Sequence, residues 1–228
     1  MMDEYLSTLE NEFKTHANPI YAAGQKAYLK NQFEFYGIKT PERRKIQIPF
    51  MTKNYLPPKV ELPSLVEIAW SKKEREWQYF GGELVYKFNK DFDLDDIYLL
   101  EFMITNKSWW DTVDIISTKS VGSYFLKYPE QRDKVIDQWI ASGNMWLQRS
   151  SVIFQLNYKQ HLDKDFLAQV IQPLLGSKEF FINKAIGWIL RHYSTTHPDW
   201  VIDITERLPL HKLSEREALR ILKKKGLF

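Results

Sequence analysis

The chain has 228 residues, of which 44% are hydrophobic and 27% are charged, values close to the average of globular domains. This composition excludes intrinsic disorder and collagen-like folds. The absence of cysteine excludes disulfides, thiolate nucleophiles and cysteine-based zinc or iron–sulfur sites. The net charge of +3 is too small to indicate nucleic-acid binding by itself. Because no linker-like stretch divides it, the chain is predicted to form one domain over residues 1–228.

The N-terminal segment 1–13 is acidic and amphipathic, unlike a secretory signal, which has a positively charged start followed by an apolar run. No apolar stretch approaches the roughly 18 residues that a membrane helix needs. We therefore expect a cytoplasmic protein that has no membrane partner.

Apolar residues recur at helical spacing almost throughout, beginning with Tyr5, Leu6, Leu9 and Phe13. Start signals predict helices at Thr40-Pro41, Tyr128-Pro129 and His197-Pro198, and a capping box at Ser214–Glu217. Breaker pairs and prolines separate the helical blocks at Pro57-Pro58, Gly143-Asn144, Gly176-Ser177 and Pro209. The pattern predicts about a dozen helices of roughly 10 to 18 residues and no strand.

Three of these helices start in a similar way, with aromatic residues at Trp109, Trp146 and Phe181, and a weaker copy begins at Glu76. A period in the mid-thirties with two helices per unit is typical of helical solenoids of the HEAT, armadillo or TPR kind. We therefore predict an all-α solenoid of antiparallel helix pairs, in which one helix of each pair lines a concave wall. An irregular helical bundle is the alternative.

Searches for common catalytic patterns find nothing. The chain has no Gly-rich phosphate loop and no Gly-x-Ser-x-Gly motif, and its five histidines form no HExxH pattern. We therefore expect no metal site and no cofactor.

Large and charged residues nevertheless share faces of the repeated helices. Spacing predicts one face for Lys107, Trp110 and Asp114, and another for Lys184, Trp188 and Arg191. The helix between them carries Arg149 and Lys159. Taken singly, a tryptophan at helical spacing is most often a core residue, and a lone charge is most often solvated. Together they indicate a binding groove, because burying unpaired cations beside a tryptophan is costly.

The residues that carry these features also resemble a known family, the AlkD family of DNA glycosylases, over nearly the whole chain. The matching strings are TPERR at 40–44, SWWDTVD at 108–114, WIASGNMWLQR at 139–149, FQLNYK at 154–159 and SKEFFINKAIGWILR at 177–191.

The resemblance implies a solenoid of HEAT-like repeats whose basic concave face holds duplex DNA. It also implies a monofunctional base-excision enzyme that hydrolyses the N-glycosidic bond of cationic alkylated purines, of the 3-methyladenine and 7-methylguanine kind, without a base-flipping pocket. By this resemblance, the catalytic residues are Asp114, Trp110 and Trp188. The DNA contacts that the resemblance and the cationic groove together predict are Tyr28, Thr40, Arg43, Arg44, Arg149, Lys159, Lys184 and Arg191. A solenoid that wraps a duplex needs no second copy, so we expect a monomer.

Two positions depart from the family pattern. Asn157 replaces a lysine, which removes one expected phosphate or lesion contact, and Lys39 stands where a polar residue is usual. Two other functions stay open on the same scaffold: a non-catalytic binder of distorted DNA, and a repeat protein that binds a partner peptide or helix.

Overall fold

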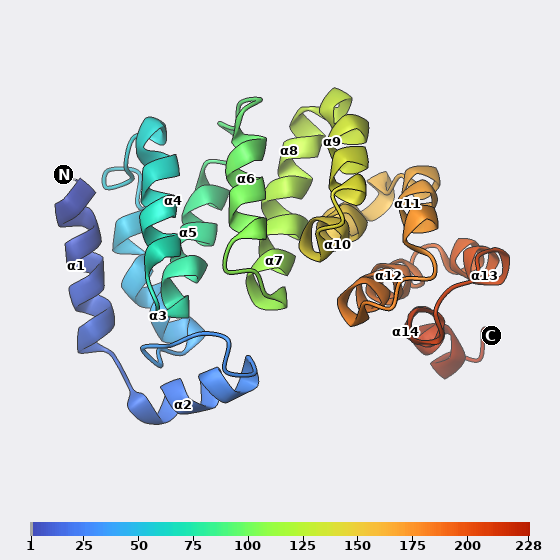
Figure 1. Ribbon diagram of the computed structural model, residues 1–228, viewed down its shortest axis with the longest axis horizontal. Helices are drawn as coiled ribbons and strands as arrows, with labels where there is room; N and C mark the ends of the chain where they lie inside the picture. The colour runs from blue at the N-terminus through green and yellow to red at the C-terminus, as the bar shows by residue number, and fades with distance from the viewer. Residues whose placement is uncertain (1) are drawn as a thin grey trace. The chain divides into compact units, whose positions relative to one another are not determined.

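The computed structural model describes residues 2–228, with side chains from residue 4 onward. Over this range the elements of secondary structure are all helices and no strand forms; only an isolated bridge joins Glu34 to Glu74 (Figure 1). The all-α prediction is confirmed. The chain packs as two compact units, Met1–Phe92 and Asp93–Phe228, and the single domain over 1–228 stays a prediction. Among residues 2–228, no helix is both long enough and apolar enough to cross a membrane.

Over residues 2–92, the first unit contains five α-helices and two short 3-10 helices. Its core is aromatic: Trp77 and Phe80 are fully buried, and the Trp77 ring meets Phe13 edge-on with centroids 5.4 Å apart. Such a pair contributes about 0.5–1.5 kcal/mol beyond the area it buries. The elements are α1 Met2–Thr15, α2 Pro19–Tyr28, α3 Thr40–Gln47, 3-10 turns at Pro49–Met51 and Lys59–Glu61, α4 Leu62–Ser71 and α5 Arg75–Lys87.

The loop between α2 and α3 is held by one buried carboxylate. Glu76, at the start of α5, accepts hydrogen bonds from the backbone N–H groups of Tyr36, Gly37 and Ile38 at 2.9–3.2 Å. Gly37 has a φ of +89°, and a Cβ there would lie 2.1 Å from the Asn18 carbonyl oxygen. Only glycine fits this turn.

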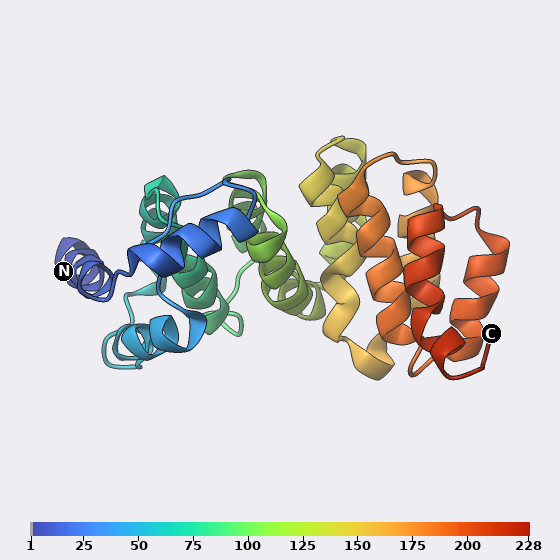
Figure 2. The same cartoon turned by 90° about the horizontal axis from the view of Figure 1, so that it is seen from below.

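The second unit contains nine α-helices and a π-helical segment. The π-helix Ile116–Val121 joins α7 to α8 without a break. Successive helices pack on one another, with α9 against α10, α10 against α12, and α12 beside α14 (Figure 2). The elements are α6 Asp96–Thr105, α7 Trp110–Ile115, α8 Gly122–Lys127, α9 Pro129–Ala141, α10 Met145–Ile153, α11 Lys164–Ile171, α12 Phe180–Tyr193, α13 Pro198–Arg207 and α14 Lys212–Lys224, with 3-10 turns at Phe154–Asn157, Lys159–His161 and Gln172–Leu174.

Most helix-start predictions are confirmed. Helices α9 and α13 begin at Pro129 and Pro198, as predicted. The predicted break at Gly143-Asn144 separates α9 from α10, and the Asn144 side chain also caps α10 by accepting from the N–H groups of Trp146 and Leu147. Helix α3 begins at Thr40, one residue earlier than predicted, with Lys39 at the capping position. This difference is within the usual uncertainty of a helix end.

The prediction of a capping box at Ser214–Glu217 is wrong. Helix α14 begins at Lys212, and the His211 ring caps it by accepting from the Leu213 N–H at 3.1 Å. Ser214 is buried and its hydroxyl donates to the Asn183 carbonyl oxygen of α12 at 2.8 Å. Packing against a neighbouring helix has replaced the local role that the motif suggested.

Candidate active site

The repeated aromatic residues that open α7, α10 and α12 meet one another in the second unit. The rings of Trp146 and Phe181 have centroids 4.9 Å apart, and Trp109 lies 5.3 Å from Phe181 and 5.9 Å from Trp146. Equivalent positions of stacked repeats are expected to become neighbours in this way. The cluster fixes the starts of the three helices relative to one another, and a cavity opens beside it.

The cavity has a volume of about 380 Å³ and lies wholly within the second unit. Helices α7 and α10 contribute one wall and α12 contributes the other. It combines aromatic faces, one carboxylate and three cations. The lining residues are Trp110, Asp114, Arg149, Phe180, Phe181, Lys184, Trp188 and Arg191.

The cavity tests the two predicted helix faces. Lys184, Trp188 and Arg191 of α12 all line it, so that face is confirmed. The other face is only partly right. Trp110 and Asp114 both line the cavity from α7, but Lys107 precedes the helix with a φ of +47° and is not part of its face.

The carboxylate of Asp114 is held by Arg149 in a two-point ion pair. The Arg149 Nε donates to Oδ1 at 2.7 Å and its Nη2 donates to Oδ2 at 2.9 Å, while Nη1 donates to the Phe181 carbonyl oxygen at 2.6 Å. Planar guanidinium–carboxylate pairs of this kind are strong and directional. Arg149 is only 3% exposed. The sequence analysis predicted Arg149 as a DNA contact. In the structure its side chain instead binds the Asp114 carboxylate.

Burial raises the pKa of the Asp114 carboxyl above its usual value. The hydrogen bonds and the positive charge of Arg149 oppose that shift, and the nearby Asp111 adds to it. The Asp114 side chain is still 17% exposed, at the cavity. It is thus a fixed carboxylate, poorly solvated by water but open to whatever enters the cavity.

Side-chain hydrogen bonds reach the π-helix and the first residue of α8. The Asn157 amide donates to the Thr118 carbonyl oxygen at 3.0 Å, and the Tyr158 hydroxyl donates to the Gly122 carbonyl oxygen at 2.8 Å. A π-helix changes the usual carbonyl pairing, so such partners are needed. Asn157 thus has a structural partner of its own.

Lys184 and Arg191 of α12 form a cationic wall of the cavity. A second carboxylate, which the sequence did not single out for the site, pairs with this wall. Glu217 of α14 forms ion pairs with both Lys184, at 2.9 Å, and Arg191. The only sequence signal at this position was the capping-box motif.

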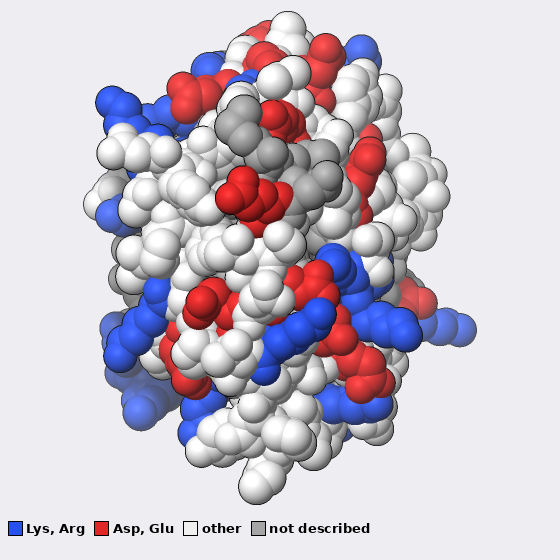
Figure 3. Space-filling model, turned by 90° about the vertical axis from the view of Figure 1, so that its left-hand side faces the viewer, with Lys and Arg blue, Asp and Glu red and all other residues white. Residues whose placement is uncertain are grey.

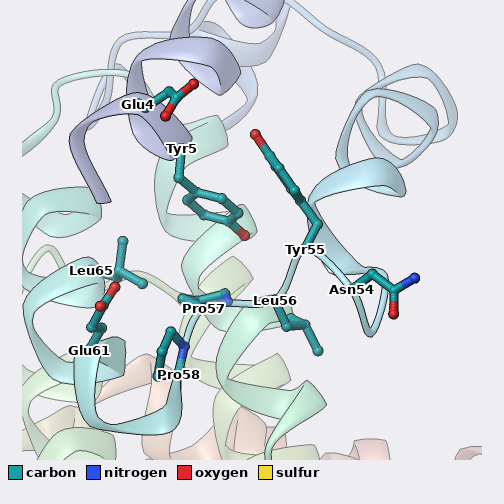
Figure 4. Close-up of a pocket in the computed structure, with 9 residues that line it drawn as sticks. All are labelled: Glu4, Tyr5, Asn54, Tyr55, Leu56, Pro57, Pro58, Glu61 and Leu65. Atoms are coloured by element: carbon teal, nitrogen blue, oxygen red, sulfur yellow. The ribbon is translucent and has the colours of Figure 1, made fainter. Parts of the chain in front are cut away.

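The first unit contains a different kind of cavity, of about 220 Å³ (Figure 4). The rings of Tyr5 and Tyr55 face each other across it, with centroids 5.6 Å apart. Leu65 and two prolines add apolar surface, and its only charged lining residues are Glu4 and Glu61. An acidic, apolar cavity repels phosphate, so we place the candidate site in the second unit.

Comparisons with known proteins agree on one family. A sequence model described as "DNA alkylation repair enzyme" matches residues 9–222. The chain belongs to the DNA alkylation repair enzyme family. It is also similar to a solved structure described as a predicted DNA alkylation repair enzyme from Enterococcus faecalis, with 33% sequence identity and a TM-score of 0.85 over 92% of this chain and 98% of that one. No curated protein sequence matches the chain. Family membership gives the protein a role in DNA repair, with DNA as its substrate.

The remaining DNA contacts expected for this family member lie mostly in the first unit. Tyr28 is 70% exposed at the end of α2, and Thr40 and Arg44 are exposed on α3. Arg43 differs, because it is buried and its guanidinium binds Gln47 and Glu83. Its partners make it a packing residue rather than a free phosphate ligand.

Lys159, predicted as a contact in the second unit, is exposed in a 3-10 turn and does not line the cavity. On the face shown in Figure 3, Lys and Arg side chains are interspersed with Asp and Glu. This mixture agrees with the small net charge of the chain.

Proposed function

We propose that this DNA alkylation repair enzyme is a monofunctional glycosylase of the AlkD kind, which hydrolyses the N-glycosidic bond of cationic alkylated purines in duplex DNA. The observation that carries the proposal is the Asp114–Arg149 pair, set in a cavity with Trp110, Trp188 and a cationic wall. A fixed carboxylate between aromatic faces suits a reaction that builds positive charge on a sugar.

The substrate determines what the site must supply. A purine methylated at N3 or N7 already carries positive charge, so the electron pair of the C1′–N bond can leave with the base as a neutral molecule, and no general acid is needed. The deoxyribose then develops oxocarbenium character at C1′. Water adds to C1′ and gives up its proton to restore a neutral sugar.

Asp114 is the group that would stabilise this charge and orient the attacking water. Its raised pKa reflects scarce solvation, and a poorly solvated carboxylate interacts strongly with a nearby cation. Arg149 keeps the carboxylate in one orientation, which we assign as its role in place of direct phosphate contact. The negative faces of Trp110 and Trp188 favour a cationic sugar for the same electrostatic reason.

Lys184 and Arg191 supply positive charge at the cavity for the backbone phosphates of the DNA. Phosphate contacts position a duplex without reading its sequence, as a repair enzyme requires. The reaction needs access to C1′ rather than to a base edge, so it requires no pocket for the flipped base. This is also compatible with bulky adducts.

The decisive experiment is release of 7-methylguanine and 3-methyladenine from methylated duplex DNA. We expect Asp114→Asn to slow release by about 100-fold or more, the usual cost of removing a key electrostatic stabiliser, while duplex binding survives. Asp137→Asn is the matched control, because it removes an exposed carboxylate of α9 that does not line the cavity. Full activity in Asp114→Asn would reject the mechanism.

The same assay distinguishes the two other candidate functions. A non-catalytic binder of distorted DNA would show salt-dependent duplex binding but no base release. A peptide-binding scaffold would show neither. Family membership and the Asp114–Arg149 pair favour the enzyme.

A further inference from the structure

Glu217 is a nearly buried carboxylate on which three cations converge. It is 7% exposed, and it pairs with Lys184 through Oε1 and with Arg191 through Oε2. Arg220, on the same helix, approaches Oε2 at 3.8 Å. Two of the three cations line the candidate active-site cavity, whereas Glu217 itself does not.

The carboxylate is ionised at neutral pH. Burial raises the pKa of Glu217, but the hydrogen bond and the charge of Lys184, together with the charges of Arg191 and Arg220, outweigh it and hold the pKa below its usual value. The group of four side chains therefore keeps a net positive charge, although each cavity cation has a partner.

The backbone brings Glu217 close to the cationic wall. At Gly187 of α12, an added Cβ would lie 2.6 Å from the Glu217 Cβ and 2.9 Å from the Ser214 carbonyl oxygen. The absence of a side chain at Gly187 lets α14 approach α12 closely, and the Ser214–Asn183 hydrogen bond fixes the register of the two helices. The carboxylate is thus held directly behind Lys184 and Arg191.

The ion pairs leave donors unused. A lysine ammonium has three N–H groups and an arginine guanidinium has five, and Glu217 engages Lys184 through one contact and Arg191 through one nitrogen. Both long side chains would otherwise sample many rotamers, and ordering them costs conformational entropy. Anchoring them in the free protein removes part of that cost when a phosphate binds.

We propose that Glu217 is a positioning residue for DNA: it anchors Lys184 and Arg191 from behind, so that their remaining N–H groups form a preformed site for a backbone phosphate beside the reacting sugar. The inference rests on the proposed function for the identity of the reacting sugar. Its opposite is simple charge repulsion, in which the carboxylate only weakens phosphate binding. The two have effects of opposite sign.

The test compares Glu217→Gln with Glu215→Gln in binding to methylated duplex DNA. Both changes remove one negative charge from α14, but Glu215 is exposed and does not hold the wall. We expect Glu217→Gln to weaken binding about ten-fold, equivalent to about 1.4 kcal/mol. Glu215→Gln should stay within about two-fold of the wild type. Binding by Glu217→Gln as tight as that of the wild type, or tighter, would overturn the proposal.

Salt dependence separates positioning from a loss of folding. If the two cations disengage, the slope of log affinity against log salt should become shallower by about 0.9 for each phosphate that the protein no longer neutralises. The rate of base release at saturating duplex should stay near that of the wild type. An unchanged slope in a folded variant contradicts the proposal.

A double-mutant cycle keeps the test decisive if Glu217→Gln folds poorly. Glu217→Asp keeps the charge but is one methylene shorter, so it should bind with intermediate affinity. In a Lys184→Ala/Arg191→Ala background, Glu217→Asp should have no further effect on binding. An additive effect would show that Glu217 does not act through Lys184 and Arg191, and it would reject the proposal.

If the wild type binds duplex DNA but releases no base, the proposed glycosylase function fails, and the binding cycle still tests the role of Glu217. If release is normal and the cycle shows no coupling, only the role of Glu217 fails.

Discussion

Glu76 in the first unit and Asp114 in the second are both carboxylates whose pKa is raised by burial. Glu76 is 1% exposed, and it accepts from three consecutive backbone N–H groups of one loop. Asp114 instead has a single arginine partner and borders a cavity. A raised pKa is therefore shared by a structural carboxylate and by the candidate catalytic one, and what distinguishes Asp114 is its access to a cavity.

The largest effect on stability is expected for Arg149→Ala. Removing the partner of the buried Asp114 carboxylate should lower the free energy of unfolding by about 3–5 kcal/mol, as measured by urea denaturation. It should also lower base release, because the carboxylate loses its orientation. Arg44→Ala is the control: its ion pair with Glu83 is exposed, so its cost should stay below about 1 kcal/mol. Equal stability of Arg149→Ala and wild type would mean that the pair is open in solution.

Glu76→Gln addresses the other half of the comparison. The amide NH₂ faces backbone donors that it cannot satisfy, which should cost about 1–3 kcal/mol in unfolding free energy. Base release per folded molecule should be unchanged, whereas Asp114→Asn should lose release under the same conditions. A loss of catalysis in folded Glu76→Gln would show that the two carboxylates are not functionally distinct.

The pH dependence of release sharpens the comparison further. The negative charge of Asp114 is present above its raised pKa and is lost as the pH falls through that value. Release should therefore fall by about ten-fold per pH unit below it, with the decline starting at a higher pH than for an ordinary aspartate, whose pKa is about 3.9. The residual activity of Asp114→Asn, corrected for spontaneous depurination, should lack this decline. If both proteins show the same acid limb, another group controls it.

Several parts of the fold were predictable because they depend on local rules. Local helix geometry explains the helix starts at Pro129 and Pro198 and the break at Gly143-Asn144. It also explains the face shared by Lys184, Trp188 and Arg191. The failures have the opposite character. Lys107 lies in a left-handed turn before α7. The motif at Ser214–Glu217 packs against α12 instead of capping the N-terminus of its own helix.

The arginines show most clearly that the sequence does not reveal the partner of a charged side chain. The family resemblance and the cationic groove assigned Arg43, Arg149 and Arg191 to DNA. In the structure Arg43 binds Glu83 and Arg149 binds Asp114, whereas Arg191 lines the cavity and remains a candidate phosphate contact although it pairs with Glu217. A guanidinium can serve a phosphate or a carboxylate equally well. Which of the two it meets depends on the neighbouring helix.

Reading along the chain was enough to predict an all-helical fold and the repeated aromatic helix starts at Trp109, Trp146 and Phe181, and the family resemblance added Asp114 and two tryptophans as candidate catalytic residues. Helix periodicity and end signals are written within a few consecutive residues, so they can be read along the chain. The pairing of Arg149 with Asp114, and that of Glu217 with Lys184 and Arg191, became visible only in the folded protein. Each of these pairs joins residues on different helices, 26 to 35 positions apart, and close packing of those helices is what brings the charges together.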